Sequence, residues 1–161
     1  VKEFDVCDSQ GHWYSLRLRP YRTLENKIDG AVLVLVDVDA LKRSQDMLRR
    51  HTELLNEAYE PIVMWELDGG ITYWNRAATE TYGYTAEQAM GRSPQELLST
   101  SPPIANYREL LLRDGRWAGE LEHTRRDGQV LRIESRISLV HENDNRKVVV
   151  ETGRPVHKAA G

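Results

Sequence analysis

The first part of the chain alternates apolar and polar residues at the period of β-strands. Residues 4–7 form a short alternating run, and residues 13–19 place apolar side chains on one face and arginines on the other. The unbroken apolar run at residues 31–36 is typical of a strand buried on both faces. The pattern therefore predicts a three-stranded meander over residues 1–39, which is too small to close a stable core without a partner.

From residue 40 the apolar positions follow the period of an α-helix. Leu41, Leu48 and Leu55 recur every seven residues, with charged residues between them. Neighbouring positions widen this apolar stripe: Met47, Leu54 and Ala58. A helix is predicted over residues 40–58, ending before Pro61. Because it spans few heptads, two interpretations stay open: a dimerising seam, or a helix packed on its own domain.

A complete α+β domain is predicted over residues 59–157. It opens with a hairpin whose turn lies at residues 68–70. Polar residues able to cap short helices follow this hairpin: Asn75, Thr85 and Ser93. A longer amphipathic helix is expected at 104–113. The last strands are expected at residues 116–126, 130–140 and 148–152. Strands at both ends with helices between them predict a five-stranded antiparallel sheet with helices on one face.

The composition is that of an ordinary globular chain, with 40% hydrophobic and 29% charged residues. No apolar stretch is long enough for a membrane-spanning helix. The net charge of -3 provides no basic field for nucleic acid or anionic lipid, so neither is an expected partner. The single cysteine, Cys7, excludes an intrachain disulfide and a zinc site with two thiolates. It fits a reducing compartment, and we expect a cytoplasmic protein. Since the chain begins without Met, we interpret it as part of a longer protein.

Seven segments after Pro61 together form a family pattern: residues 71–78, 82–85, 90–92, 96–98, 115–117, 119–121 and 123–128. On these segments the domain resembles a PAS sensory domain, most closely those upstream of bacterial sensor histidine kinases. The family usually ends in Asp-Ile-Thr, whereas residues 155–157 read Pro-Val-His here. Residues 13–14, 19–23 and 28–30 match the last three strands of the family. On these residues the segment 1–39 resembles the end of another PAS domain, of the kind found in chemotaxis methylesterase–methyltransferase fusions.

The resemblance implies a domain organisation and a function. The C-terminal half of a truncated PAS domain at 1–39 would be joined by a connecting signalling helix at 40–58 to a complete PAS domain at 59–157. Such a module would sense a small molecule or a partner, form a homodimer, and relay through its helices. The effector domain would lie in the same parent chain, a sensor histidine kinase or a chemotaxis methyltransferase fusion. The fragment itself is expected to have no catalytic activity.

A PAS sheet curls around its helices and leaves an apolar cavity that can hold a ligand. The residues expected to line it are Trp74, Tyr82, Met90, Leu97, Tyr107, Leu111, Trp117, Leu121, Ile133, Ser135 and Ile137. Because aromatic and methionine side chains at such spacing usually fill a core, we favour packing over ligand binding for most of them. Ser135 differs, since its hydroxyl would point inward with apolar neighbours and would need a hydrogen-bond partner.

Two cofactors of PAS relatives can be tested by residue type. A flavin adduct needs a cysteine near the ring, but the only thiol, Cys7, lies in the other half-domain. Haem needs an axial histidine on the long helix, and residues 104–113 contain none. His123 and His141 are expected to be exposed at strand edges. We therefore expect neither cofactor, and the scattered histidines predict no metal site.

His51 on the predicted helix is the remaining candidate for chemistry. A phosphoacceptor histidine on a dimerising helix is typical of sensor kinases, so the alternative function is a catalytic fragment of a kinase or a methyltransferase. No glycine-rich phosphate or cofactor loop accompanies it, and we favour a solvated helical histidine. The isolated meander over 1–39 would expose an apolar face and a free edge. Either a second copy of the chain or the complete domain would protect this surface, and we favour a homodimer contact.

Overall fold

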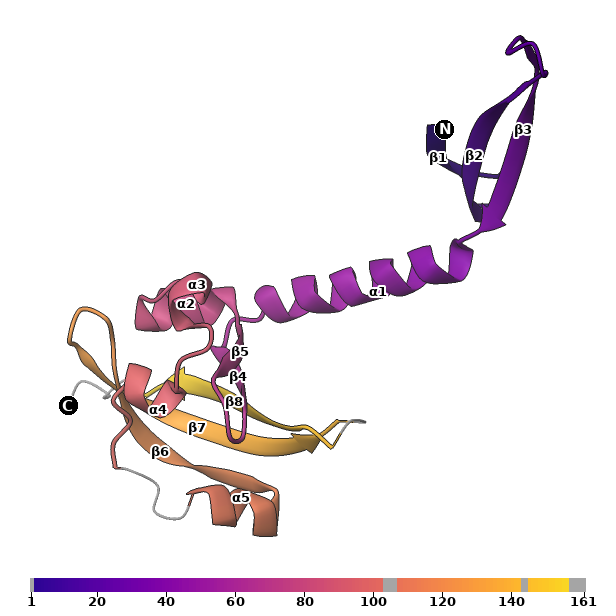
Figure 1. Ribbon diagram of the computed structural model, residues 1–161. Coiled ribbons are helices and arrows are strands. Elements are labelled where there is room, and N and C mark those ends of the chain that lie inside the picture. Colours follow the sequence, from indigo (N-terminus) through magenta and orange to yellow (C-terminus); the bar gives the residue numbers. More distant parts are fainter. Residues whose placement is uncertain (1, 103–106, 143–144, 157–161) are drawn as a thin grey trace. The chain divides into compact units, whose positions relative to one another are not determined.

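The computed structural model describes residues 2–102, 107–142 and 145–156 (Figure 1). The chain divides into two compact units, Val1–Thr52 and Glu53–Gly161, and each is described by itself. Among the described residues, none of the helices combines the length and the hydrophobicity that crossing a bilayer requires.

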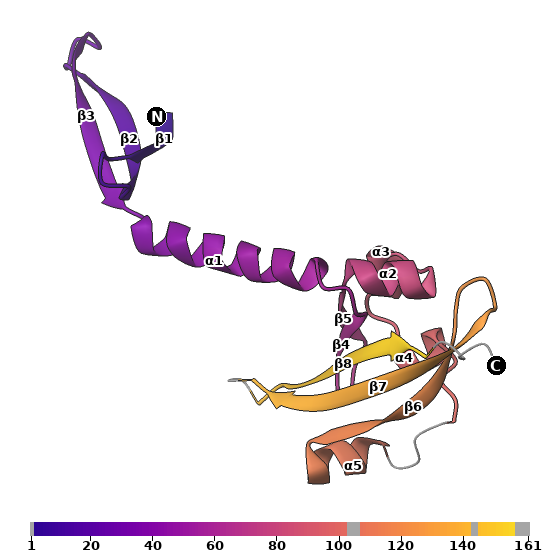
Figure 2. The same cartoon turned by 180° about the vertical axis from the view of Figure 1, so that it is seen from behind.

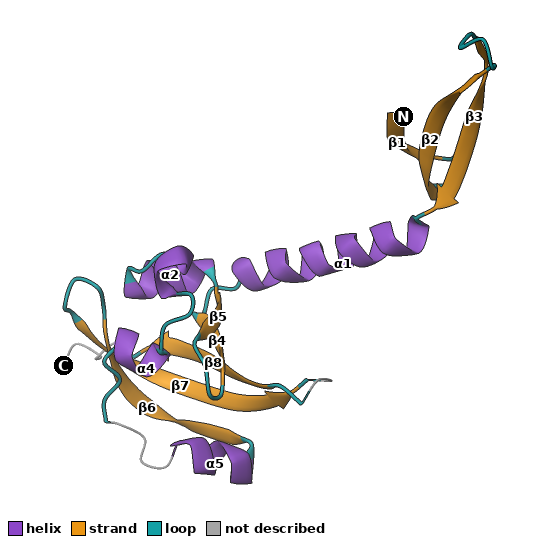
Figure 3. Ribbon diagram, in the orientation of Figure 1, coloured by secondary structure: helices purple, strands orange, loops and turns teal. Residues whose placement is uncertain are grey.

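The first unit contains a three-stranded antiparallel meander (Figure 3). Its strands are β1 (Lys2–Cys7), β2 (Trp13–Arg22) and β3 (Ile28–Asp37). They pair in the order β1-β2-β3, with Leu16 opposite Phe4 on one side and Leu35 on the other. The predicted meander is thus confirmed, and β3 lies at one edge of the sheet.

The prediction that residues 31–36 form a strand buried on both faces is wrong. Every residue of β3 is exposed, and Leu33 and Leu35 keep 59% and 60% of their surface accessible. An unbroken apolar run identifies a strand but does not say what covers it. The described part of the first unit supplies a neighbouring strand but no layer that buries this run. The expectation of an exposed apolar face is confirmed.

Helix α1 (Asp39–Asn56) follows β3 and ends two residues earlier than the predicted helix. The side chains of its apolar stripe are exposed: Leu41, Met47, Leu48, Leu54 and Leu55. Ala58, the last predicted member of the stripe, lies beyond the helix and is half-buried. His51 is exposed as well. The amphipathic pattern therefore forms a helix without forming a buried face in the single chain.

The described part of the second unit contains the nine elements expected for the α+β domain, in the expected order. They are β4 (Ile62–Glu66), β5 (Ile71–Trp74), α2 (Arg76–Tyr82), α3 (Ala86–Ala89), α4 (Pro94–Leu97), α5 (Tyr107–Asp114), β6 (Arg116–Thr124), β7 (Val130–His141) and β8 (Lys147–Pro155). The residues predicted to start the long helix, 104–106, lie outside the described residues. The sheet order is β5-β4-β8-β7-β6, and all neighbours are antiparallel. The first and last strands of the domain are therefore adjacent (Figure 2).

Local sequence signals explain the short helices. The side chain of Asn75 accepts a hydrogen bond from the Ala78 amide and caps α2, which Gly83 ends in the left-handed conformation at φ 80°. Thr85 and Gln88 form a reciprocal capping box at α3. These caps confirm the sequence prediction and fix where each helix meets the sheet.

The core of the second unit lies between these helices and one face of the sheet. The helical region contributes Ala78, Tyr82, Ala89, Leu97, Leu98 and Leu111. The strands contribute Val63, Trp65, Ile71, Trp74, Leu121, Ile133, Ile137 and Val149. Burial of this apolar surface is the main stabilising contribution to the unit.

Candidate functional site

Among the described residues of the second unit, four polar side chains are buried next to one another in the apolar core. They are Tyr82 on α2, His123 on β6, Ser135 on β7 and Glu151 on β8, and each is at most 7% exposed. Buried polar groups carry a desolvation cost unless they find partners. We define these four residues as the polar cluster.

Strand alternation places three members of the polar cluster on one face of the sheet. Successive inward positions on β6 are Leu121 and His123, and those on β8 are Val149 and Glu151. Ser135 lies on β7 between these two strands, directly opposite Gly153 of β8. Since β7 pairs with both β6 and β8, the sheet order brings the three inward polar side chains together.

The polar cluster forms a chain of contacts. Nδ1 of His123 lies 3.1 Å from the Tyr82 hydroxyl, with the two ring centroids 5.4 Å apart. Nε2 of His123 lies 3.8 Å from Oε1 of Glu151, which is longer than a hydrogen bond. The Ser135 hydroxyl donates to the same Glu151 oxygen. Trp74 extends the series, since its ring lies 5.6 Å from that of Tyr82.

Burial sets the protonation states of the polar cluster. It raises the pKa of Glu151 to about 7, although the hydrogen bond from Ser135 acts in the opposite direction. It lowers the pKa of His123 to about 4, and it raises the pKa of Tyr82 well above its ordinary value. At neutral pH the histidine is therefore uncharged, the tyrosine keeps its proton, and Glu151 lies close to its titration midpoint.

Most of the predicted pocket residues are core residues in the structure. Trp74, Tyr82, Leu97, Leu111, Leu121, Ile133 and Ile137 belong to the buried cluster of the core. Trp117 is partly buried against this core, and the side chain of Tyr107 is outside the description. Met90 is 45% exposed at the end of α3, so its expected place in the interior is wrong. Ser135 points inward as expected, with Glu151 as its partner. Ligand binding by these residues stays a prediction.

Two members of the polar cluster were missed in the sequence. His123 was expected to be exposed at a strand edge, but it is 1% exposed because α2 places Tyr82 against it. The signal was the two-residue spacing from Leu121, which puts both side chains on one face. Glu151 was not singled out, because glutamate is rarely buried. Glu151 follows Val149 by two residues, which likewise places both side chains on one face of the strand. His141 is exposed, as expected.

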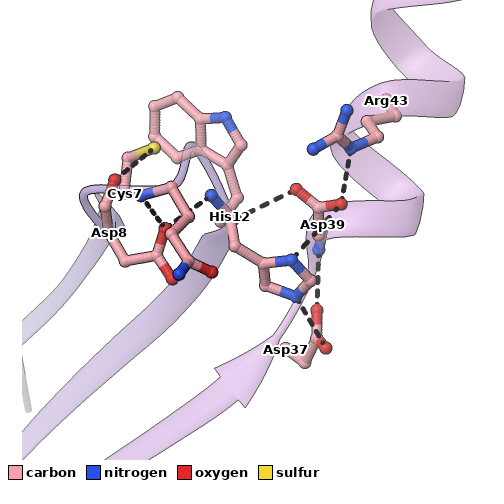
Figure 4. Close-up of polar contacts among 8 residues, drawn as sticks. Cys7, Asp8, His12, Asp37, Asp39 and Arg43 are labelled. Atoms are coloured by element: carbon pink, nitrogen blue, oxygen red, sulfur yellow. Dashed lines mark hydrogen bonds and ion pairs between the residues drawn. The ribbon is translucent and has the colours of Figure 1, made fainter.

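A second polar group lies at the junction between β3 and α1 in the first unit (Figure 4). Nε2 of His12 lies 3.0 Å from Asp37 Oδ2, and Nδ1 lies 3.7 Å from Asp39 Oδ2. Arg43 donates to Asp39 at 2.5 Å, and the Trp13 amide donates to Asp39 Oδ1. The turn between β1 and β2 is thereby tied to the start of the helix.

These contacts shift the acidity of the junction residues. The hydrogen bond with Asp37 raises the pKa of His12, and the same bond lowers the pKa of Asp37. The guanidinium of Arg43 lowers the pKa of Asp39. Within the described ranges, no group of three or more His, Cys, Asp or Glu side chains is arranged to hold a metal ion. The junction is thus an ion-pair network that favours the protonated histidine.

Asn75 joins three elements of the second unit. Its Oδ1 accepts hydrogen bonds from the amides of Ile62 and Ala78, each at 2.9 Å. Its Nδ2 donates to the carbonyls of Leu55 at 3.2 Å and Glu60 at 3.0 Å. The side chain is fully buried. One amide therefore connects the last turn of α1 to the first strand of the sheet and to α2, the helix that ends with the cluster residue Tyr82.

Comparison with protein families identifies both units. Residues 60–154 match a model of the PAS domain, and residues 2–39 match another model of the PAS domain. The first match covers more than half of the chain, and the chain therefore belongs to the PAS domain family. No curated protein matches it.

Solved structures share the fold. A PAS domain from Colwellia psychrerythraea is 24% identical, with a TM-score of 0.60 over 69% of this chain and 98% of its own. A PAS domain of a two-component sensor histidine kinase is 16% identical, with a TM-score of 0.63 over 70% of this chain and 99% of its own. The PAS domain of nitrogen regulation protein NR(II) from Vibrio parahaemolyticus is 19% identical, with a TM-score of 0.57 over 66% and 97%. At these identities the likeness establishes the PAS fold.

Proposed function

We propose that the chain is a sensory signalling module that relays and has no catalytic role of its own. Its second unit is the receptor, and the effector lies in the same parent chain, a sensor histidine kinase or a chemotaxis methyltransferase fusion. Family membership and the histidine-kinase PAS domain among the similar structures support this function. The proposed organisation is half a PAS domain at 1–39, a signalling helix at 40–58 and a complete PAS domain at 59–157.

The observation that carries the proposal is the hydrogen bonding of Asn75. A signal in the core that moves Tyr82 also moves α2, and the first turn of α2 bonds to Asn75. Asn75 in turn holds the carbonyl of Leu55 in the last turn of α1. A receptor needs such a physical link between its interior and its output helix. The relay would be a shift between two arrangements of this link, with a coupling free energy of about 1–3 kcal/mol.

Amide hydrogen exchange on the Tyr82→Phe variant tests the relay. The substitution keeps the ring and removes the hydroxyl that contacts His123. We expect exchange at residues 53–60 to accelerate about fivefold relative to β7, because a hydrogen bond contributes about 1 kcal/mol. Thr85→Ala, which removes an exposed cap on α3, is the matched control and leaves residues 53–60 unchanged. Unchanged exchange at residues 53–60 in Tyr82→Phe would refute the relay.

We also propose that the apolar stripe of α1 forms a homodimer contact. The stripe residues Leu48 and Leu55 are exposed in the single chain and lie seven residues apart, the spacing of a helix–helix seam. Replacing both by alanine should weaken self-association measured by sedimentation equilibrium. Arg50→Ala, on the opposite side of the helix, is the control and should leave it unchanged. Equal association constants for wild type and the double variant would remove the proposal.

A further inference from the structure

Glu151 is a carboxyl group buried in an apolar environment. On its own sheet it lies between Val63 of β4 and Ile137 of β7, both of which are core residues. Its side chain is about as buried as theirs. A carboxylate in such a place is normally paired with an arginine or a lysine, because burying an unpaired charge is costly. The described residues give Glu151 no such cation.

The groups that face Glu151 can be named element by element. From β7 comes the Ser135 hydroxyl, which donates to Oε1, and from β6 comes His123 with Nε2 at 3.8 Å. Tyr82 of α2 reaches Glu151 through the histidine. The other elements that form this core, β4, β5, α3, α4 and α5, contribute apolar side chains to it: Val63, Trp65, Ile71, Trp74, Ala89, Leu97 and Leu111.

We propose that Glu151 is a proton-binding site, and that gain or loss of its proton is a signal for the receptor. The inference rests on the proposed function, because it names the proton as a ligand of that receptor. The geometry supplies the switch, since the ring of His123 lies between two partners, Tyr82 at Nδ1 and Glu151 at Nε2. With Glu151 protonated, His123 keeps its contact with the Tyr82 hydroxyl at 3.1 Å.

Loss of the proton to solvent leaves a carboxylate that needs a second donor besides Ser135. Nε2 of His123 is the nearest nitrogen, and a normal hydrogen bond requires it to approach by roughly 1 Å. That movement draws the imidazole away from Tyr82. The proton balance is complete, because the carboxyl proton leaves to water and the new bond uses the N–H that neutral histidine already carries. The change then reaches α2, which carries Tyr82.

The acidity of the group agrees with this geometry. Burial raises the pKa of Glu151 to about 7, whereas an exposed glutamate titrates near 4.5. Ser135 bonds to the carboxylate form and so lowers the pKa. Glu151 therefore changes its charge in the range of pH that cells maintain, and no other signal molecule is needed for it to respond.

NMR of the full chain with 13C-labelled glutamate tests the proposal. We expect the Glu151 carboxyl carbon to titrate near pH 7, and the Tyr82 and His123 signals to change with the same midpoint. In Ser135→Ala we expect the midpoint to rise by about one pH unit, because the bond that stabilises the carboxylate is lost. A buried carboxyl without a switching role would titrate without moving Tyr82.

Glu151→Gln and Glu134→Gln are the paired variants. Glu134 lies on the same sheet, is half-buried and bonds to Arg154, so Glu134→Gln should leave the pH-dependent change of the Tyr82 signals in place. Glu151→Gln should abolish that change. Titration of Glu151 near pH 4.5, or an unchanged transition in Glu151→Gln, overturns the proton site. Tyr82→Phe tests the relay separately: a Glu151 midpoint near 7 with unchanged exchange at residues 53–60 supports the proton site and refutes only the relay.

Discussion

Replacing Asn75 by alanine removes one side chain that four backbone groups share. The amides of Ile62 and Ala78 lose their acceptor, and the carbonyls of Leu55 and Glu60 lose their donor. The position is fully buried, so no side chain can turn in from the surface to replace it. The substitution therefore separates the end of α1, the first strand and α2 in a single step.

The expected loss of unfolding free energy follows from these four groups. The two amides are buried, and leaving a buried donor without a partner costs about 1–3 kcal/mol each. The two carbonyls are partly buried and can be hydrated, so each costs closer to about 0.5 kcal/mol. We expect Asn75→Ala to destabilise the second unit by about 3–7 kcal/mol in total.

Urea denaturation followed by the fluorescence of Trp65 and Trp74, which are buried in this unit, measures the loss. Thr85→Ala is the control, because it also removes a helix cap but at an exposed position, and it should cost about 1 kcal/mol. If Asn75→Ala costs no more than Thr85→Ala at an unchanged denaturant slope, the four hydrogen bonds do not connect these elements as described.

Three further outcomes are expected. The raised pKa of Glu151 means that folding favours its protonated form. The free energy of unfolding should therefore be highest below about pH 4.5 and should fall by about 3 kcal/mol as the pH rises through about 7. Urea titrations should show no such loss in Glu151→Gln, and an identical loss in that variant would contradict the prediction. Leu111→Ala empties a fully buried position on α5 and should cost about 2–5 kcal/mol in the same assay, a cost below 1 kcal/mol being inconsistent with the packing. The raised pKa of His12 means that its contact with Asp37 stabilises the junction below about pH 6.5 and is lost at higher pH. Amide hydrogen exchange in the first turn of α1 should therefore accelerate with pH by more than the intrinsic rate does in wild type. The same excess should be absent in His12→Gln.

The sequence predicts the parts of this fold that depend on neighbouring residues. The cap at Asn75, the capping box at Thr85 and the hairpin at 68–70 all use contacts within a few residues, and all form as expected. The succession of elements along the chain also predicts an antiparallel α+β sheet. The PAS fold itself was expected from the resemblance of residues 71–128 to that family, and the order of the strands in the sheet came from the structure.

The predictions that were wrong concern burial, because burial depends on what covers a residue in three dimensions. The apolar run of β3 has the pattern of a buried strand, yet it is exposed because burial requires a second layer that the pattern cannot specify. The prediction for His123 erred in the opposite direction. Its polar side chain suggested exposure, but Tyr82, on a helix far away in the sequence, covers it. Met90 follows the same rule, since its position at the end of α3 turns it towards solvent.

Glu151 shows most clearly why the candidate site needed the structure. The alternation from Val149 predicts that it points inward, but only the sheet register brings Ser135 and His123 towards it from two other strands. Its shifted acidity is a consequence of this three-dimensional environment and of no local sequence feature. Residue type and strand alternation therefore identified Ser135 as unusual but could not name its partner.

The side-chain amide of Asn75 gives the most direct test of the central claim that the polar cluster communicates with α1. Its Nδ2 bonds to Leu55 in the last turn of α1, so its NMR signals report on that contact. Recorded between pH 5.5 and 8.5, these signals should shift with the midpoint of the Glu151 carboxyl and should stay constant in Glu151→Gln. A Glu151 carboxyl that titrates near pH 7 while the Asn75 amide signals do not move would contradict the claim.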